Sequence, residues 1–236
     1  LMTGKWTRAG KVALTIAITV IAIVGTAFFL TLFLSPLLVR PLAHFNGLTA
    51  GQQLAEYRRI LAYFVSPQDY LHFRWLPLAP AGEHHFAAVR QLIRGAAGLT
   101  LLALGGSAIG HRWAKRHYQL GRLLAGWPLV ASGGTGLLAI AILRFPSLFL
   151  RFHQWAFADQ TWQFTTKKEP IIRLLSLTFF WRYLIVWGCL VAALMLLWRW
   201  GLTRALFHFF SPGQPGLDRA DHRRDQGNDD DGEDDQ

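Results

Sequence analysis

The sequence predicts an all-α membrane protein in which four transmembrane helices carry a small extracellular cap formed by the two outer loops. Two features of the composition support this fold class. Of the 236 residues, 52% are hydrophobic and only 16% are charged, whereas soluble domains carry roughly a quarter charged residues. The third observation is a set of four apolar stretches long enough to cross a bilayer core of ~30 Å, which needs about 20 residues.

The four spans are expected at residues 12–35, 92–110, 123–143 and 180–200. The first has no charged residue, and the second carries only Arg94, near one end, where its side chain can reach the interface. The third contains Pro128, and the fourth carries Arg182 near its start. Because the first span is long and lacks a small-residue cleavage site, it is expected to be a retained helix and not a signal peptide.

The distribution of basic residues predicts the orientation of the spans. With four spans, both termini lie on one side together with the short loop 111–122, which holds four basic residues and no acidic one. This pattern is typical of a cytoplasmic loop. The two long loops and their borders hold 12 Lys and Arg against 9 on the other side, but these loops are several times longer and contain all 5 acidic residues of the body. We therefore expect cytoplasmic termini and two outward-facing loops.

Two regions are predicted: a transmembrane domain at residues 1–211, with a cap from about 36–91 and 144–179, and a disordered acidic tail at 212–236. Residues 217–236 hold 9 acidic and 3 basic residues and too little apolar content to fold. The body then has 21 basic and 5 acidic residues, a net charge of +16. This charge suits contact with anionic membrane lipids. Nucleic acid is not an expected partner, because the basic residues are spread along membrane borders.

The first outer loop contains a predicted amphipathic helix at residues 50–64. Its pattern places four residues on an apolar face: Leu54, Tyr57, Leu61 and Phe64. The remaining side chains are expected elsewhere on the helix, among them Gln53, Glu56, Arg59 and Tyr63. Such a helix can lie on the membrane surface or cover the end of the bundle.

Familiar catalytic motifs are missing from the sequence. It has no Gly-x-Ser-x-Gly elbow, no His-Glu-x-x-His zinc helix and no P-loop. Ser107 lies in a run of small residues, which is better explained by close packing between helices than by nucleophilic catalysis.

Three histidines remain at the membrane borders on the outer side: His84, His85 and His153. A lone histidine in such a place is more often a hydrogen-bonded interface residue than a catalyst. Two imidazoles together with Glu83 or Asp159 could hold zinc, although adjacent histidines on an extended chain point in opposite directions. No metal and no cofactor are therefore predicted.

Two sequence motifs around these histidines resemble those of the bacterial lipoprotein intramolecular transacylase family, whose members have four spans and an extracellular cap. The first motif matches His85, Phe86, Val89 and Arg90. The second matches Phe152, His153, Phe157, Trp162, Ile171, Ile172, Phe179 and Phe180. Ala88 stands where the family usually has an aspartate.

The resemblance implies an acyltransferase of the bacterial cell membrane that acts on diacylated lipoproteins. The sn-2 acyl chain of the diacylglyceryl group on the N-terminal cysteine moves to the α-amino group of the same cysteine, which gives an N-acyl lyso-form lipoprotein. His85 and His153 are the expected catalytic residues, with the roles of acid and base left open. The expected substrate-binding residues are Phe86, Phe152, Trp155, Phe157, Trp162 and Arg90.

Arg90 and Asp159 are also expected to support the histidines. The implied reaction needs no cofactor and no metal. Two other interpretations remain open at this point: a non-enzymatic lipid-binding or scaffold protein, and a zinc-dependent membrane hydrolase. The sequence does not predict an oligomeric state.

Overall fold

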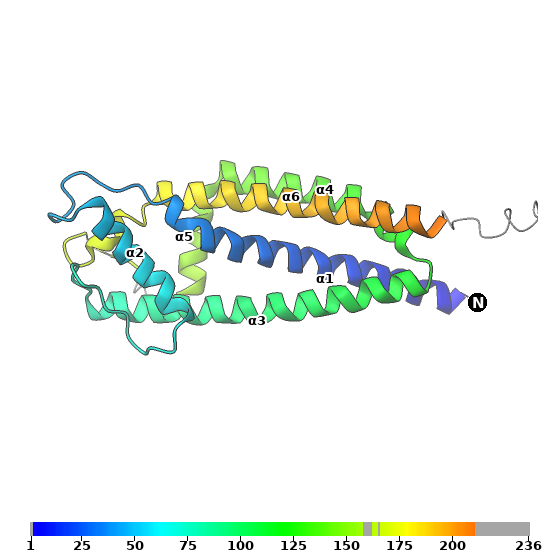
Figure 1. Cartoon of the computed structure of the whole chain (residues 1–236), viewed down its shortest axis with the longest axis horizontal. Coiled ribbons are helices and arrows are strands. Elements are labelled where there is room, and N and C mark those ends of the chain that lie inside the picture. The colour runs from blue at the N-terminus through cyan, green and yellow to red at the C-terminus, as the bar shows by residue number, and fades with distance from the viewer. Residues whose placement is uncertain (1, 158–161, 165, 211–236) are drawn as a thin grey trace, which may run out of the picture.

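The structure is a computed structural model that describes residues 2–157, 162–164 and 166–210. Four long helices dominate it (Figure 1): α1 (Met2–Leu34), α3 (Pro80–Arg116), α4 (Leu120–Leu143) and α6 (Leu177–Phe210). Each is long and apolar enough to cross a membrane, and the described residues include no strand. The predicted all-α fold with four spans is therefore confirmed. The acidic tail predicted at 212–236 lies outside the described residues.

The four helices alternate in direction. α1 packs against both α3 and α6, and α4 packs mainly on α6. The segments between α1 and α3 and between α4 and α6 lie at the same end of the bundle, opposite the N-terminus (Figure 1). We call residues 38–79 and 144–176 the cap, and this end of the bundle the cap end.

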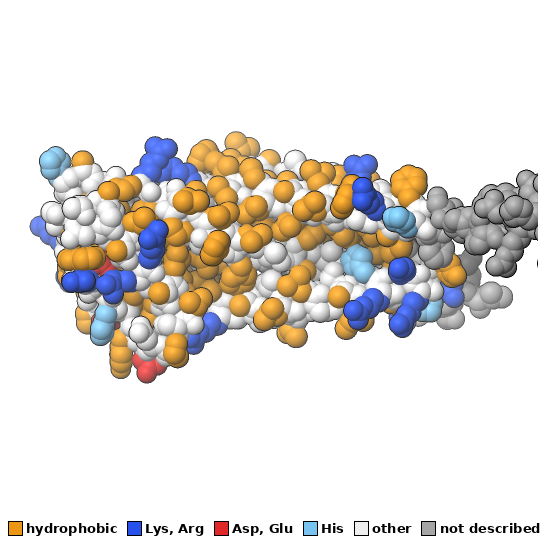
Figure 2. Space-filling view, viewed as in Figure 1, with side chains coloured by type: hydrophobic (Ala, Val, Ile, Leu, Met, Phe, Trp, Pro, Cys, Tyr) orange, Lys and Arg blue, Asp and Glu red, His pale blue; other side chains and the backbone are white. Residues whose placement is uncertain are grey.

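The surface is banded along the bundle. Hydrophobic side chains cover its middle, and Lys and Arg side chains gather toward both ends (Figure 2). Large apolar side chains of the middle band face outward, for example Leu102, Leu129 and Leu137. In a soluble protein such a surface would be a liability, but it matches the hydrocarbon core of a bilayer.

Small residues and hydroxyl groups let α1 and α3 approach closely. Gly25 of α1 lies so near Thr100 of α3 that an added Cβ would collide with the threonine side chain. The Thr19 and Ser107 hydroxyl oxygens are 2.8 Å apart and share a hydrogen bond between the two helices. Ser107 thus lies in a helix contact, as the run of small residues around it predicted.

Helix α3 begins at Pro80, well before the span expected at 92–110. Proline suits the first helical turn because its missing N–H would be unpaired there, and Glu83 complements the positive end of the helix dipole. At 1.5 Å per residue its 37 residues extend roughly 55 Å, longer than the ~30 Å bilayer core. His84 and His85 therefore lie on a helix that rises out of the membrane, and the expectation of an extended chain there is wrong.

Helix α2 (Ala50–Val65) begins at a capping box formed by Thr49 and Gln52. Its existence matches the amphipathic pattern at 50–64, and Tyr57 and Phe64 of the predicted apolar face are buried, but the buried face also includes polar residues that the pattern placed elsewhere. The side chains it buries are Gln53, Glu56, Tyr57, Ile60, Tyr63 and Phe64. Leu54 and Leu61 are only partly buried.

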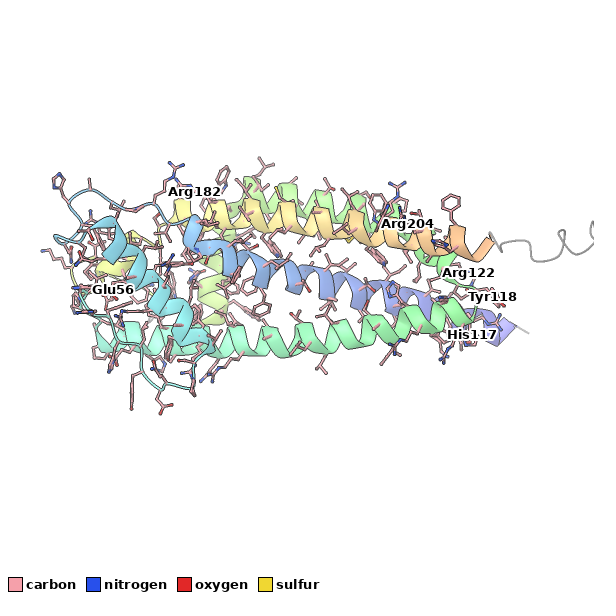
Figure 3. The ribbon with its side chains drawn as sticks, viewed as in Figure 1. Glu56, His117, Tyr118, Arg122, Arg182 and Arg204 are labelled. Atoms are coloured by element: carbon pink, nitrogen blue, oxygen red, sulfur yellow. The ribbon has the colours of Figure 1, made fainter. Side chains whose placement is uncertain are left out.

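Long-range hydrogen bonds explain why polar side chains of α2 are buried. The Gln53 amide accepts from the Leu42 N–H at 2.8 Å and donates to the carbonyls of Leu42 and Leu48. The Glu56 carboxylate accepts from the backbone N–H groups of Arg74 and Trp75 at 2.8 and 2.6 Å. Figure 3 shows Glu56 within the cap. Both residues hold loops that would otherwise leave backbone groups unpaired.

The second half of the cap contains α5 (Phe145–Ala156) and the short 3₁₀ helix η2 (Pro170–Arg173). Helix α5 crosses the bundle at a steep angle to the spans (Figure 1). None of its residues is fully buried. It is therefore a peripheral element, although it carries His153.

Candidate functional site

The two histidines singled out by the sequence meet at the cap end. His85 comes from the second turn of α3 and His153 from the last turn of α5. Their ring centroids are 6.2 Å apart and the rings are inclined by only 22°. The fold thus places two imidazoles face to face from distant parts of the chain.

Aromatic rings enclose His85. It is 6% exposed, and its ring contacts Phe157 at 4.5 Å and Phe164 at 5.1 Å in edge-to-face arrangements. Phe86, the next residue on α3, stacks on Phe164 with a centroid distance of 6.4 Å. Bulk water has little access to this imidazole.

The hydrogen bond of His153 fixes the proton on its ring. Its Nδ1 lies 2.8 Å from the Phe149 carbonyl oxygen. A carbonyl only accepts, so Nδ1 carries the hydrogen, and in the neutral ring Nε2 then has the free lone pair. Burial lowers the pKa of His153 below 6.5, and the hydrogen bond to Phe149 partly opposes this shift. The hydrogen bond leaves Nε2 as the ring nitrogen that can accept a proton, and the lowered pKa favours the neutral ring at neutral pH.

Two further rings confine His153. The Phe149 ring lies 4.1 Å from it and the Trp162 ring 5.5 Å. Phe157 contacts both histidines, at 4.5 Å from His85 and 5.6 Å from His153. The result is a water-poor, aromatic site with two titratable groups.

The other expected site residues are placed less uniformly. Phe152 contacts the His153 ring at 5.6 Å, but 43% of its surface is exposed, and Trp155 is 80% exposed. Arg90 donates to the carbonyls of Ser66 and Gln68 and lies over the Tyr63 ring. It thereby ties the α2–α3 connection to α3, and its binding role stays a prediction. Asp159 lies outside the described residues.

Two residues of the site, Phe149 and Glu169, were not among the expected ones. Phe149 supplies the carbonyl that orients His153, and its position four residues earlier on the same helix is a signal that could have identified it. Glu169 is buried against Gly82, one helical turn before His85. Nothing in the local sequence pattern indicates that contact.

Among the described residues, no three His, Cys, Asp or Glu side chains converge as metal ligands. His84 and His85 are separated by about 100° around α3, so one ring faces the pocket and the other is exposed. The described residues of the site thus combine two imidazoles with a hydrophobic enclosure. This combination suits proton transfer in a medium from which water is excluded.

The family model of the lipoprotein intramolecular transacylase Lit matches residues 9–180 of the chain. The chain belongs to the Lit family. It is thus a multi-pass membrane acyltransferase, a lipoprotein intramolecular transacylase. No curated protein matches the chain.

Solved structures of the lipoprotein intramolecular transacylase Lit from Bacillus cereus have the same fold. One has a TM-score of 0.68 at 22% sequence identity and covers 87% of this chain and 97% of the solved chain. Two others are of variants in which a histidine is replaced by arginine or by alanine. Their TM-scores are 0.66 and 0.65, at 18% and 21% identity. They cover 86% and 88% of this chain, and 96% of each solved chain.

Proposed function

We propose that this Lit-family chain moves the sn-2 acyl chain of the diacylglyceryl group on a lipoprotein's N-terminal cysteine to the α-amino group of that cysteine. The product is an N-acyl lyso-form lipoprotein. The observation that carries the proposal is the pair of imidazoles, 6.2 Å apart, inside an aromatic enclosure at the cap end. We expect the ester groups of a membrane-anchored substrate at this level.

An intramolecular reaction explains why the site needs no serine or cysteine nucleophile. Amine and ester belong to one substrate molecule. Holding them in contact supplies an effective molarity of ~10⁵–10⁸ M. Converting an ester to an amide is favourable and consumes no cofactor, so positioning and proton transfer are the tasks left to the protein.

His153 is the proposed general base. The α-amino group has a pKa of about 8 and is mostly protonated at neutral pH, so it must lose a proton before it can attack. The Nε2 lone pair of His153 is available because Nδ1–H is engaged with the Phe149 carbonyl. General base catalysis of this kind contributes roughly 10²–10⁴-fold.

His85 is the proposed partner of the developing oxyanion and of the departing alkoxide. Attack forms the C–N bond and places negative charge on the ester oxygen, where an imidazole N–H can donate. Collapse breaks the bond between the acyl carbon and the glyceryl oxygen. The proton that the nitrogen loses after attack passes through the imidazoles to that oxygen, and the proton that the ammonium lost before attack is released to solvent. The products are one amide and one alcohol.

The aromatic side chains are proposed to bind the apolar parts of the substrate. Phe86, Phe157 and Trp162 surround the acyl and glyceryl groups and exclude the water that would hydrolyse the ester. Phe152 and Trp155 extend this surface toward the lipid, and Arg90 holds the cap above it. The site would thus select an acyl-bearing substrate that arrives from within the membrane.

The cap end is proposed to face outward, with both termini in the cytoplasm. Replacement of exposed residues by cysteine, in a chain whose Cys189 is changed to alanine, tests this. Gln68→Cys in the cap should react with a membrane-impermeant thiol reagent in intact cells, and His117→Cys at the opposite end should not. Reverse labelling would place the histidines in the cytoplasm and end the proposal.

Co-expression with a model lipoprotein tests the reaction itself. Mass spectrometry of the N-terminal lipopeptide should show an N-linked acyl chain and one O-linked chain fewer. Release of free fatty acid without N-acylation would indicate a hydrolase. An unchanged lipopeptide, in the presence of folded and inserted protein, would indicate a lipid-binding protein.

A further inference from the structure

Helix α5 has three stripes of different character. Phe145, Phe149 and His153, spaced by four residues, face the protein, where the Phe149 ring also packs on Phe180 at 5.1 Å. A second stripe is apolar and exposed: Leu148, Phe152 and Trp155. A third is polar and exposed: Ser147, Arg151 and Gln154. The last two stripes each have the i, i+4, i+7 spacing of a single helix face.

The exposed apolar stripe is only partly covered by the described residues: Phe152 touches the His153 and Phe157 rings, and the rest of the stripe faces outward. Leu148 and Phe152 are 41% and 43% exposed, and α5 buries no residue at all. The stripe follows directly from the exposed apolar surface of α4, whose Leu137, Ile140 and Leu143 face the bilayer. Helix α5 begins where α4 ends and crosses the spans (Figure 1), which is the orientation expected of a helix in the plane of the membrane surface.

The charges on α5 are all of one sign. Arg144 precedes the helix, Arg151 lies two turns later and is exposed, and α5 contains no acidic residue. A guanidinium group beside an exposed apolar stripe is well matched to a lipid phosphate, because it donates several hydrogen bonds and is always charged. A tryptophan at the same level is typical of the membrane interface.

We propose that α5 is an interfacial helix whose apolar stripe enters the leaflet at the cap end, and that Arg144 and Arg151 bind the headgroup of an anionic phospholipid there. The partner is a lipid of the surrounding leaflet, distinct from the acylated substrate. The proposal does not depend on the roles assigned to the two histidines.

Spin labels on the two exposed stripes test the depth of α5. Each of the six stripe residues is replaced singly by cysteine in the Cys189→Ala chain, labelled with a nitroxide and reconstituted in phosphatidylcholine vesicles containing phosphatidylglycerol. Labels at Leu148, Phe152 and Trp155 should be accessible to oxygen and shielded from a water-soluble nickel complex. Labels at Ser147, Arg151 and Gln154 should show the opposite. Equal access of the nickel complex to both stripes would overturn the proposal.

Spin-labelled lipids test the headgroup preference on the full chain. The wild type should associate with phosphatidylglycerol more strongly than with phosphatidylcholine. Arg144→Gln with Arg151→Gln should lower this preference by about fivefold per arginine. A matched pair of exposed arginines at the opposite end, Arg112→Gln with Arg116→Gln, serves as the control. An equal loss in both pairs would mean that only overall charge matters, and would refute a site at α5.

Discussion

The two helices of the cap are packed in opposite ways. Helix α2 buries six side chains, and its buried Gln53 and Glu56 are fixed by hydrogen bonds to distant loops. Helix α5 buries none, and rings hold its inner face. The difference indicates that the part of the cap that maintains the shape of the protein is separate from the part that carries His153.

This separation has a chemical meaning. Buried polar groups that hydrogen-bond to distant loops favour one arrangement of the chain, which suits the half of the cap that covers α3. An element with few buried contacts can be displaced at little cost. The proposed catalytic pair thus joins an anchored histidine, His85, to a histidine on a peripheral helix, His153.

Replacement of the two histidines should have the largest effect on the rate of N-acylation. It tests whether His85 on the anchored helix α3 and His153 on the peripheral helix α5 act together. His153→Asn retains a donor near the Nδ1 position and His85→Gln remains polar, but neither amide takes up a proton near neutral pH. Each change should lower the rate of N-acylation by ~10²-fold or more. The double variant should be little slower than either single one, because groups that act as a unit are not additive.

The neighbouring histidine provides the control for this series. His84→Gln changes an exposed residue of the same helix and should retain most of the activity. Strong N-acylation by the folded double variant would show that proximity alone is sufficient for the reaction, and the proposed proton transfer would be abandoned.

Thermal unfolding in detergent should sharpen the contrast between α2 and α5. Glu56→Ala removes the buried acceptor of two partly buried backbone N–H groups and should destabilise the protein by about 2 kcal/mol. Trp155→Ala removes a larger side chain, but one that is 80% exposed, so its cost should stay within about 0.5 kcal/mol. If the two variants lost equal stability, the two helices would not differ in the way described.

The pH dependence of kcat/KM should show the smallest effect. Because burial lowers the pKa of His153, the proposed base stays neutral until the pH falls below 6.5. The decrease of kcat/KM at acidic pH should therefore have its midpoint below that value. Trp162→Ala admits water to the ring, so the pKa should rise toward 6.5 and the midpoint should move to higher pH. Trp200→Ala lies on α6 toward the end of the bundle opposite the cap and should leave the midpoint of the acidic decrease unchanged. An unmoved midpoint in Trp162→Ala would exclude His153 as its source.

The transmembrane part of the fold could be predicted from the sequence because long apolar stretches have few alternative structures. The beginning of α3 could not, since residues 80–91 are helix-forming but not apolar enough to resemble a span. The buried face of α2 could not be predicted either. Periodicity places Gln53 and Glu56 off the apolar face, and only the folded chain brings loop backbone groups to them.

The functional site, too, could be predicted from the sequence only in part. The resemblance to a family identified His85 and His153, and the structure brings their rings together. The tautomer of His153 depends on a carbonyl whose position follows from the helical conformation of α5. The outward placement of Trp155 could not be read from composition, because an aromatic residue beside a histidine suits a pocket and a lipid surface equally well.

The uninterrupted length of α3 also has a mechanical consequence. One continuous helix passes through the membrane and carries His85 in its second turn. The height of that imidazole above the hydrocarbon core is therefore set by the number of helical residues between them, at roughly 1.5 Å per residue. The ester of a membrane-anchored substrate stays at the level of the lipid headgroups, whereas the height of the imidazole is fixed by the helix. A bilayer that is a few ångströms thicker or thinner, and that the protein matches only by tilting, would bring the ester to the wrong level. If His85 acts as proposed, we expect turnover to depend on membrane thickness through the number of residues between Arg94 and His85.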